Sequence, residues 1–342
     1  MEGFSLFSIV ETRCCGSDRL VSLVKIMKFK FSLSLVFVLF VTFFVNCFAY
    51  HIKNGNVGPV ASALDKGQDI NEKNEEGNTP LMLASRYKQH EMMRLLLGRG
   101  AKINETNLKG ETALMLSAVW GNLEGVKILL EHGANPNILK PNGDSVLHSA
   151  TVTGDEEIAF LLIKHGAEVK GNQQTQAGLL YWASHSCSLK LVTYYLGKSI
   201  NPEWKYLYGY TPLMTVCATY KDAKEAVNPE KIVKLLIEHK ANVNARSDAG
   251  ATPLHAAASA PNFFLAKALI ENGAEVNALD NLGETPLMKS VGSGFTYYVE
   301  VRVIKLLLLN GADKTVKDNL GKTAYDHATK NRLPNQYLDL VR

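Results

Sequence analysis

The spacing of one set of glycines constrains this chain more than any other feature of its sequence. Eight positions form the series: Gly77, Gly110, Gly143, Gln176, Gly209, Gly250, Gly283 and Gly321. Successive positions are 33 residues apart, except for intervals of 41 before Gly250 and 38 before Gly321, which imply insertions of 8 and 5 residues. A chain that repeats at this period is expected to fold as stacked units, each in contact with its neighbours only.

A Thr-Pro-Leu motif follows four of the eight positions, as in Thr79-Pro80-Leu81 and Thr252-Pro253-Leu254-His255. The period and the motif together resemble the ankyrin repeat over roughly residues 51–342. The resemblance implies a mainly α fold, an ankyrin-repeat solenoid of stacked helix-turn-helix units with β-hairpin fingers. It also implies that the fingers and inner helices form a concave face that binds another protein.

Each residue of the motif has a physical role. Threonine can cap the first turn of a helix with its hydroxyl, and proline fits the next position because no amide is needed there. The second helix of a repeat carries an apolar stripe, as in Val126, Leu129 and Leu130 or in Ile158, Leu161 and Leu162. Glycines are expected to end these second helices in a left-handed conformation. They are Gly100, Gly133, Gly166, Gly273 and Gly311.

The repeats give the domain organisation. Residues 1–26 are an unassigned leader, 27–49 a signal peptide or N-terminal membrane anchor, and 50–342 the repeat domain. The domain has an N-terminal cap at 50–73, about seven repeats at 74–317 and a C-terminal cap at 318–342. The fourth repeat, about 173–205, is degenerate, since Gln176 replaces glycine, Gly178 replaces threonine, and Tyr194-Tyr195 replace two leucines. The fifth and seventh repeats carry the insertions.

The segment before the repeats predicts export. Lys25, Lys28 and Lys30 precede an apolar run from Phe31 to Phe48, and Cys47-Phe48-Ala49 places small residues before a cleavage point at Tyr50. This is the pattern of a secretory signal peptide. Residues 31–49 also approach the length of a membrane anchor, so an uncleaved anchor stays open. In either case we expect the repeats in the periplasm, the envelope or outside the cell.

Aromatic residues cluster in the degenerate region. Seven of the 13 tyrosines and two of the three tryptophans fall between Tyr181 and Tyr220. Trp204, Tyr206, Tyr208 and Tyr210 alternate, which would place all four rings on one face if the segment were an extended strand. Exposed aromatic residues often anchor protein interfaces. We therefore predict a partner-binding finger here, although the rings could instead fill space left by the fourth repeat.

Tyr297 and Tyr298, in the insertion of the seventh repeat, are a second candidate for partner binding. Asn recurs near the start of each finger, so the glycosylation motif at Asn104 has a simpler structural explanation. A disulfide between Cys187 and Cys217 stays open in an oxidising compartment. The formal net charge of +4 gives no indication of nucleic-acid binding.

No segment predicts catalysis or a cofactor. Gly197-Lys198-Ser199 and Gly321-Lys322-Thr323 resemble the end of a phosphate-binding loop but lack its earlier glycine. His185 and Cys187 have no second ligand pair at metal-binding spacing. Five other histidines are expected to be structural because they recur at repeat positions. They are His132, His148, His165, His239 and His255.

The sequence therefore predicts a non-enzymatic scaffold, monomeric, without cofactor or metal, whose partner is another protein. It would touch a membrane only through its N-terminal apolar segment. Two roles stay open: an accessory or stress-protection protein of the cell envelope that supports a resident enzyme, and a secreted effector.

Overall fold

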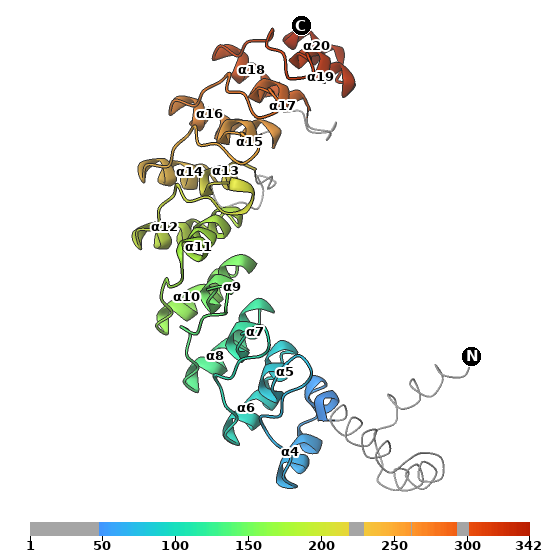
Figure 1. Ribbon diagram of the computed structural model, residues 1–342, viewed down its shortest axis with the longest axis vertical. Helices are drawn as coiled ribbons and strands as arrows, with labels where there is room; N and C mark the ends of the chain where they lie inside the picture. The colour runs from blue at the N-terminus through green and yellow to red at the C-terminus, as the bar shows by residue number, and fades with distance from the viewer. Residues whose placement is uncertain (1–47, 219–228, 261, 293–300) are drawn as a thin grey trace, which may run out of the picture. The chain divides into compact units, whose positions relative to one another are not determined.

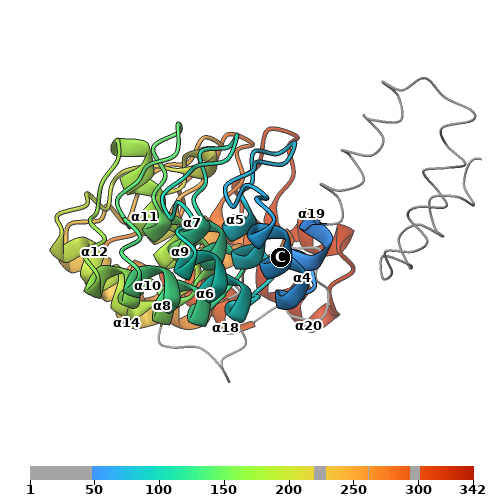
Figure 2. The same cartoon turned by 90° about the horizontal axis from the view of Figure 1, so that it is seen from below.

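The computed structural model describes residues 48–218, 229–260, 262–292 and 301–342 (Figure 1). Within these ranges the regular elements are helices, and no strand is present. The described helices belong to two compact units, which divide between Asn135 and Pro136. In each unit the loops that precede the first helix of every repeat project to one side of the helices (Figure 2).

In the described part of the first unit, helical residues 48–53 are followed by one further single helix and two helical pairs. They are α4 (Val57–Asp65), α5 (Pro80–Arg86) with α6 (His90–Gly98), and α7 (Ala113–Val119) with α8 (Leu123–Glu131). The first helices of the pairs, α5 and α7, pack on each other and form an inner layer. The second helices, α6 and α8, stack with α4 as the outer layer.

The second unit repeats this arrangement. Its pairs are α9 (Val146–Thr153) with α10 (Glu156–Lys164), α11 (Gln173–His185) with α12 (Leu189–Gly197), α13 (Pro212–Ala218) with α14 (Pro229–Glu238), α15 (Pro253–Ser259) with α16 (Phe263–Glu271), α17 (Pro286–Gly292) with α18 (Val301–Leu309), and α19 (Ala324–Lys330) with α20 (Asn335–Val341). A short 3-10 helix, η1 (Leu207–Gly209), precedes α13. Each inner helix packs on the next inner helix, from α9 to α19.

The predicted helix caps are confirmed. The Thr79 hydroxyl accepts a hydrogen bond from the Met82 amide, and the Thr112 hydroxyl accepts one from Met115. Gly133, just after the outer helix α8, adopts the predicted left-handed conformation with φ 82°. In the fourth and fifth repeats Ser199 and Lys240 occupy this place, at φ 61° and 71°. Residues with a Cβ are disfavoured there, so these two helix ends are strained.

The core lies between the two helical layers. Val126, Leu129, Ile158 and Leu162 of the predicted outer-helix stripes are fully buried, whereas Leu161 is half-buried. Alanines of the inner helices are buried too, which lets these helices approach closely. Fully burying an aliphatic side chain contributes about 1.5–3 kcal/mol, and every repeat buries several. The stack therefore derives its stability mainly from contacts within and between adjacent repeats.

The fingers are turns rather than the β-hairpins expected from the sequence. In repeat seven the Asp280 amide donates to the Glu284 carbonyl, and Asp280 Oδ1 accepts hydrogen bonds from the amides of Leu282 and Glu284. Asn107 in repeat two makes the same contacts with Lys109 and Glu111. A side chain that accepts hydrogen bonds from two loop amides replaces the backbone hydrogen bonds that a pair of strands would supply.

The recurring asparagines connect adjacent repeats. Asn244 Oδ1 accepts a hydrogen bond from the Glu275 amide at 2.8 Å, and its Nδ2 donates to the Gly273 carbonyl at 3.0 Å. Asn277 makes the equivalent pair of bonds with Asp313 and Gly311. These bonds satisfy backbone groups at the end of the next outer helix. They give the recurrence of asparagine a structural cause.

Candidate interaction surface

Consecutive fingers of the second unit are joined through their backbones. The Asp248 amide donates to the Tyr208 carbonyl, the Asn281 amide to the Ala249 carbonyl, and the Asn319 amide to the Leu282 carbonyl, at 2.9–3.1 Å. The residue that precedes the series glycine therefore lies beside its equivalent in the next repeat. We call these residues fingertips.

The fingertips of the second unit are apolar from the fifth repeat onward. Tyr208 is 80% exposed, Leu282 62% and Leu320 83%, and the small Ala249 lies between them in the series. We call these four residues the fingertip row. The equivalent residues Glu76, Lys109 and Asn142 of the earlier repeats are polar. An exposed apolar row that the fold does not require is a feature of interaction surfaces.

The fourth repeat has no finger. Helix α11 begins at Gln173, with Asn172 as its cap, and runs through the residues that form a finger elsewhere. A methyl group on Gly178 would lie 2.8 Å from His148 Nε2 and 3.0 Å from Tyr206 Cε2. Glycine at this place therefore makes room for the Tyr206 ring. Gly178, which replaces the usual threonine in repeat four, therefore accommodates the Tyr206 side chain of repeat five.

The predicted alternation of Trp204, Tyr206, Tyr208 and Tyr210 on one face is wrong. The segment forms a turn and η1 rather than a strand, and Tyr208 has φ 57°. Tyr206 packs on Tyr181 with ring centroids 5.2 Å apart, whereas Tyr208 projects into solvent. Trp204 and Tyr210 are half-buried.

Several aromatic residues of this region have structural roles. Tyr195 is fully buried and its hydroxyl is paired with the Thr151 hydroxyl. The rings of Trp182 and Tyr181 pack edge to face at 5.2 Å. Burial raises the pKa of the Tyr181 and Tyr206 hydroxyls, opposed by hydrogen bonds to Thr215 and Trp182 respectively. Filling of space thus explains these rings, and Tyr208 is the exposed exception.

Tyr297 and Tyr298 lie outside the described residues. Cys187 and Cys217 are both buried, and burial raises the pKa of the Cys217 thiol.

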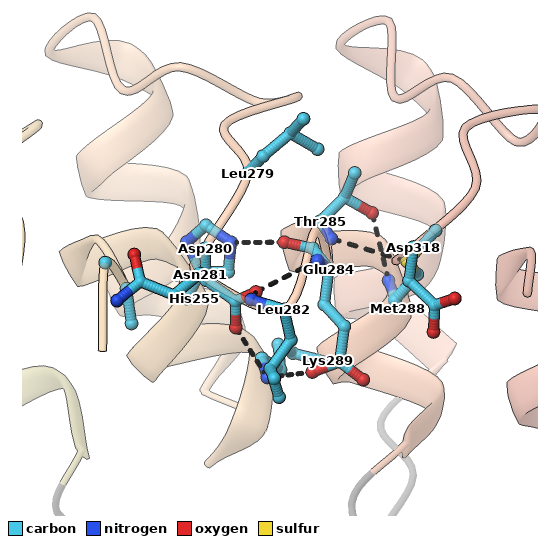
Figure 3. A network of polar contacts seen from close by, with 12 residues as sticks. His255, Leu279, Asp280, Asn281, Leu282, Glu284, Thr285, Met288, Lys289 and Asp318 are labelled. Carbon is cyan, nitrogen blue, oxygen red and sulfur yellow. Dashed lines mark hydrogen bonds and ion pairs between the residues drawn. The ribbon is translucent and has the colours of Figure 1, made fainter. Parts of the chain in front are cut away.

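Two histidines at the same repeat position have different surroundings. His255 Nδ1 accepts a hydrogen bond from the Thr252 amide, and its Nε2 lies 2.9 Å from the Glu284 carbonyl of the next finger (Figure 3). His148 lies 3.3 Å from Asp144 through Nδ1, but its buried Nε2 has no hydrogen-bond partner in the described part of the chain. The residue equivalent to Glu284 is Ala177, which lies inside α11, so its carbonyl serves the helix.

A polar network holds the last fingers together. Lys289 Nζ pairs with Asp280 at 2.8 Å and with Glu284 (Figure 3). Glu284, Asp318 and His327 each bring one possible metal-ligand atom within 4.8 Å of the others. His327 Nε2 lies 2.9 Å from Asp318 Oδ2, and Asp318 Oδ1 accepts two backbone amides. These bonds, with the Lys289 cation, account for the cluster as part of the fold.

Among the described residues no helix combines the length and the hydrophobicity needed to cross a membrane. The predicted apolar segment at 31–49 falls outside them except for Phe48 and Ala49.

Comparison with protein families agrees with this architecture. The model of ankyrin repeats, in three copies, matches residues 48–140, 105–174, 179–280, 223–318 and 262–342. The chain belongs to the ankyrin repeat family. Ankyrin repeats indicate a protein–protein interaction module, and the family is generally a non-enzymatic scaffold. No curated protein matches the chain.

One position of the repeat carries a sequence signal for the fingertip row that the motifs along the chain do not show. Aligning the ankyrin repeats on their glycines brings Tyr208, Leu282 and Leu320 into one column, in which the first three repeats carry polar residues. Alternating aromatic residues along one segment do not indicate this column, because Leu282 and Leu320 lie in other repeats.

Proposed function

We propose that this ankyrin repeat protein is a non-enzymatic scaffold that binds an apolar segment of another protein along the fingertip row. Export, by a cleaved signal peptide or with a membrane anchor at residues 31–49, is part of the proposal. The basic and apolar N-terminal sequence supports it.

The exposure of the row carries the proposal. Tyr208, Leu282 and Leu320 project from turns whose backbones are joined by hydrogen bonds, so their spacing is set by the fold rather than by the partner. Little conformational freedom is then lost when a partner binds. Tyr208 is the expected main contact, because tyrosine is enriched among the residues that dominate binding energy. The packing of Tyr206 on Tyr181 anchors the finger that carries it.

Affinity capture with a fingertip variant tests the proposal. The bait is the full chain, compared with a Tyr208→Asn/Leu282→Asn/Leu320→Asn variant, which copies the asparagine that repeat three carries at position 142. Leu309→Asn is the matched control, since Leu309 is equally exposed but lies on the outer helix α18 of the same unit. Captured proteins are identified by mass spectrometry, and circular dichroism confirms equal helix content.

A partner held by the original chain and by the control, but lost with the triple variant, would support the proposal. Equal capture by all three baits would exclude the fingertip row as the site. Fractionation of the source cells tests export. Retention in the envelope would favour an accessory role beside a resident enzyme, release would favour an effector, and a cytoplasmic chain would contradict export.

A further inference from the structure

Aromatic and cationic side chains alternate across the ends of the helical residues 48–53, of α5 and of α7 in the first unit. Lys53 Nζ lies 5.6 Å from the centre of the Tyr87 ring. The Arg86 guanidinium lies 5.9 Å from the Tyr87 ring and 5.2 Å from the Trp120 ring. We call Lys53, Tyr87, Arg86 and Trp120 the ladder. Contacts of this kind hold both the rings and the cations in position.

The ladder is exposed. Trp120 is 48% exposed and Tyr87 42%. Lys88 adds a third cation beside them, because its Nζ donates to the carbonyl of Gly121, the residue after Trp120.

The repeat does not require aromatic residues here. Tyr87 and Trp120 each follow the inner helix directly, and the equivalent residues in the described part of the second unit are small or polar. These are Thr153, Ser186, Ala260 and Asn331. The inner helices α9, α15 and α19 form without them. Packing within the repeat therefore gives no reason for the two rings.

The charge of the ladder is largely uncompensated. Of the three cations Lys53, Arg86 and Lys88, only Arg86 has a carboxylate within 4 Å among the described residues of the first unit. That carboxylate belongs to Glu76, which lies 3.7 Å away and is mostly exposed. A pair of this kind contributes little and can be exchanged for a better-placed anion. Arginine presents a planar fork that matches a carboxylate.

We propose that the ladder is a second binding surface, for an acidic, extended segment of a partner protein. Carboxylates of that segment pair with Arg86, Lys53 and Lys88, and an apolar side chain between them packs on the exposed face of Trp120. The inference goes beyond the fingertip row, because it concerns the first unit and depends on charge.

Fluorescence anisotropy with a defined peptide tests the proposal. The probe is a fluorescein-labelled peptide of repeated Glu-Glu-Leu, titrated with the full chain at low salt and at about 0.15 M salt. The same peptide with Gln in place of Glu is the control probe. Trp120→Thr copies the residue of repeat three, and Arg86→Gln keeps a good helix former in α5. Lys66→Gln removes one exposed charge outside the ladder.

We expect the acidic peptide to bind more tightly than its Gln counterpart, and Trp120→Thr and Arg86→Gln each to weaken binding about tenfold. Lys66→Gln should have little effect. Absence of binding at low salt, or an equal loss from Lys66→Gln and Arg86→Gln, would overturn the proposal, the latter because it indicates attraction to net charge alone. Binding to vesicles with anionic lipid but not to the peptide would assign the surface to a membrane and overturn it too.

Discussion

The two buried histidines lead to a prediction with opposite signs at equivalent positions. Methionine occupies their place in four other repeats, as Met82, Met115, Met214 and Met288. We expect His148→Met to stabilise the protein and His255→Met to destabilise it. In the first case methionine removes a ring nitrogen that has no partner in the described structure. In the second it removes a hydrogen bond to the Glu284 carbonyl.

The magnitudes follow from these contacts. A buried polar atom without a partner costs about 1–3 kcal/mol, and a satisfied hydrogen bond contributes about 0.5–1.5 kcal/mol. The cap loses little in either variant, because methionine sulfur can accept the amide of the capping residue, Ser145 or Thr252, as Met82 accepts that of Thr79 at 3.4 Å. His148→Met also loses the 3.3 Å contact of Nδ1 with Asp144, which offsets part of the gain, so we expect about 1 kcal/mol of stabilisation for His148→Met and about 1 kcal/mol of destabilisation for His255→Met. For a unit of this size each corresponds to a shift in Tm of about 2–4 °C.

Differential scanning calorimetry of the full chain at pH 7.5 measures the two shifts. Native-state hydrogen exchange locates them, since repeat proteins often unfold in parts. Protection should rise in α9 for His148→Met and fall around α15 and the finger at Asp280 for His255→Met. The reasoning is refuted if His148→Met lowers Tm as His255→Met does, because the unpartnered nitrogen would then carry no cost.

Three further predictions concern the same unit. Burial lowers the pKa of His148 and of His255 below the ordinary 6.5, so between the folded-state pKa and 6.5 the unfolded chain binds more protons than the folded chain. Stability should therefore decrease as the pH is lowered through this window, by up to about 1.4 kcal/mol per pH unit for each histidine. A Tm that is flat between pH 7.5 and 5 would contradict this. Lys240→Gly should raise stability by about 1 kcal/mol in urea unfolding, because Lys240 has φ 71° where other repeats use glycine; a decrease would show that no strain is stored there. Gly178→Ala should destabilise the protein by at least about 1 kcal/mol, because the added methyl group would lie 3.0 Å from Tyr206 Cε2. The substitution should also loosen the Tyr206 ring, which its NMR signals would show. An unchanged Tm and spectrum would show that the site has spare room.

The repeat pattern was sufficient to predict most helices, since their ends are set locally. Thr79 followed by Pro80 starts a helix through a cap that depends on neighbouring residues alone. The early start of α11 was not predictable in this way. Asn172 caps that helix instead of opening a finger, and the Gly178 within it lies against Tyr206, which belongs to the next repeat. Sequence periodicity does not report such a contact.

The two surfaces differ in how far the sequence could reveal them. Tyr208, Leu282 and Leu320 share one repeat position, so an alignment of the repeats is enough to find the row. Tyr87 and Trp120 also share a position, 33 residues apart. The contact of Arg86 with both rings depends on the direction of its side chain, however, which the sequence does not show. The predicted strand failed because alternation along Trp204–Tyr210 says nothing about a residue at positive φ.

The space at Gly178 that the Tyr206 ring occupies also limits how this gene can change by recombination. Repeats that contact each other only through a common interface can be duplicated, deleted or exchanged singly. The fourth and fifth repeats of this chain cannot be separated in that way, because an exchange of either one would leave a ring without space or a space without its ring. We therefore expect a designer who shortens the array to retain more stability by cutting on either side of both repeats than by cutting between them.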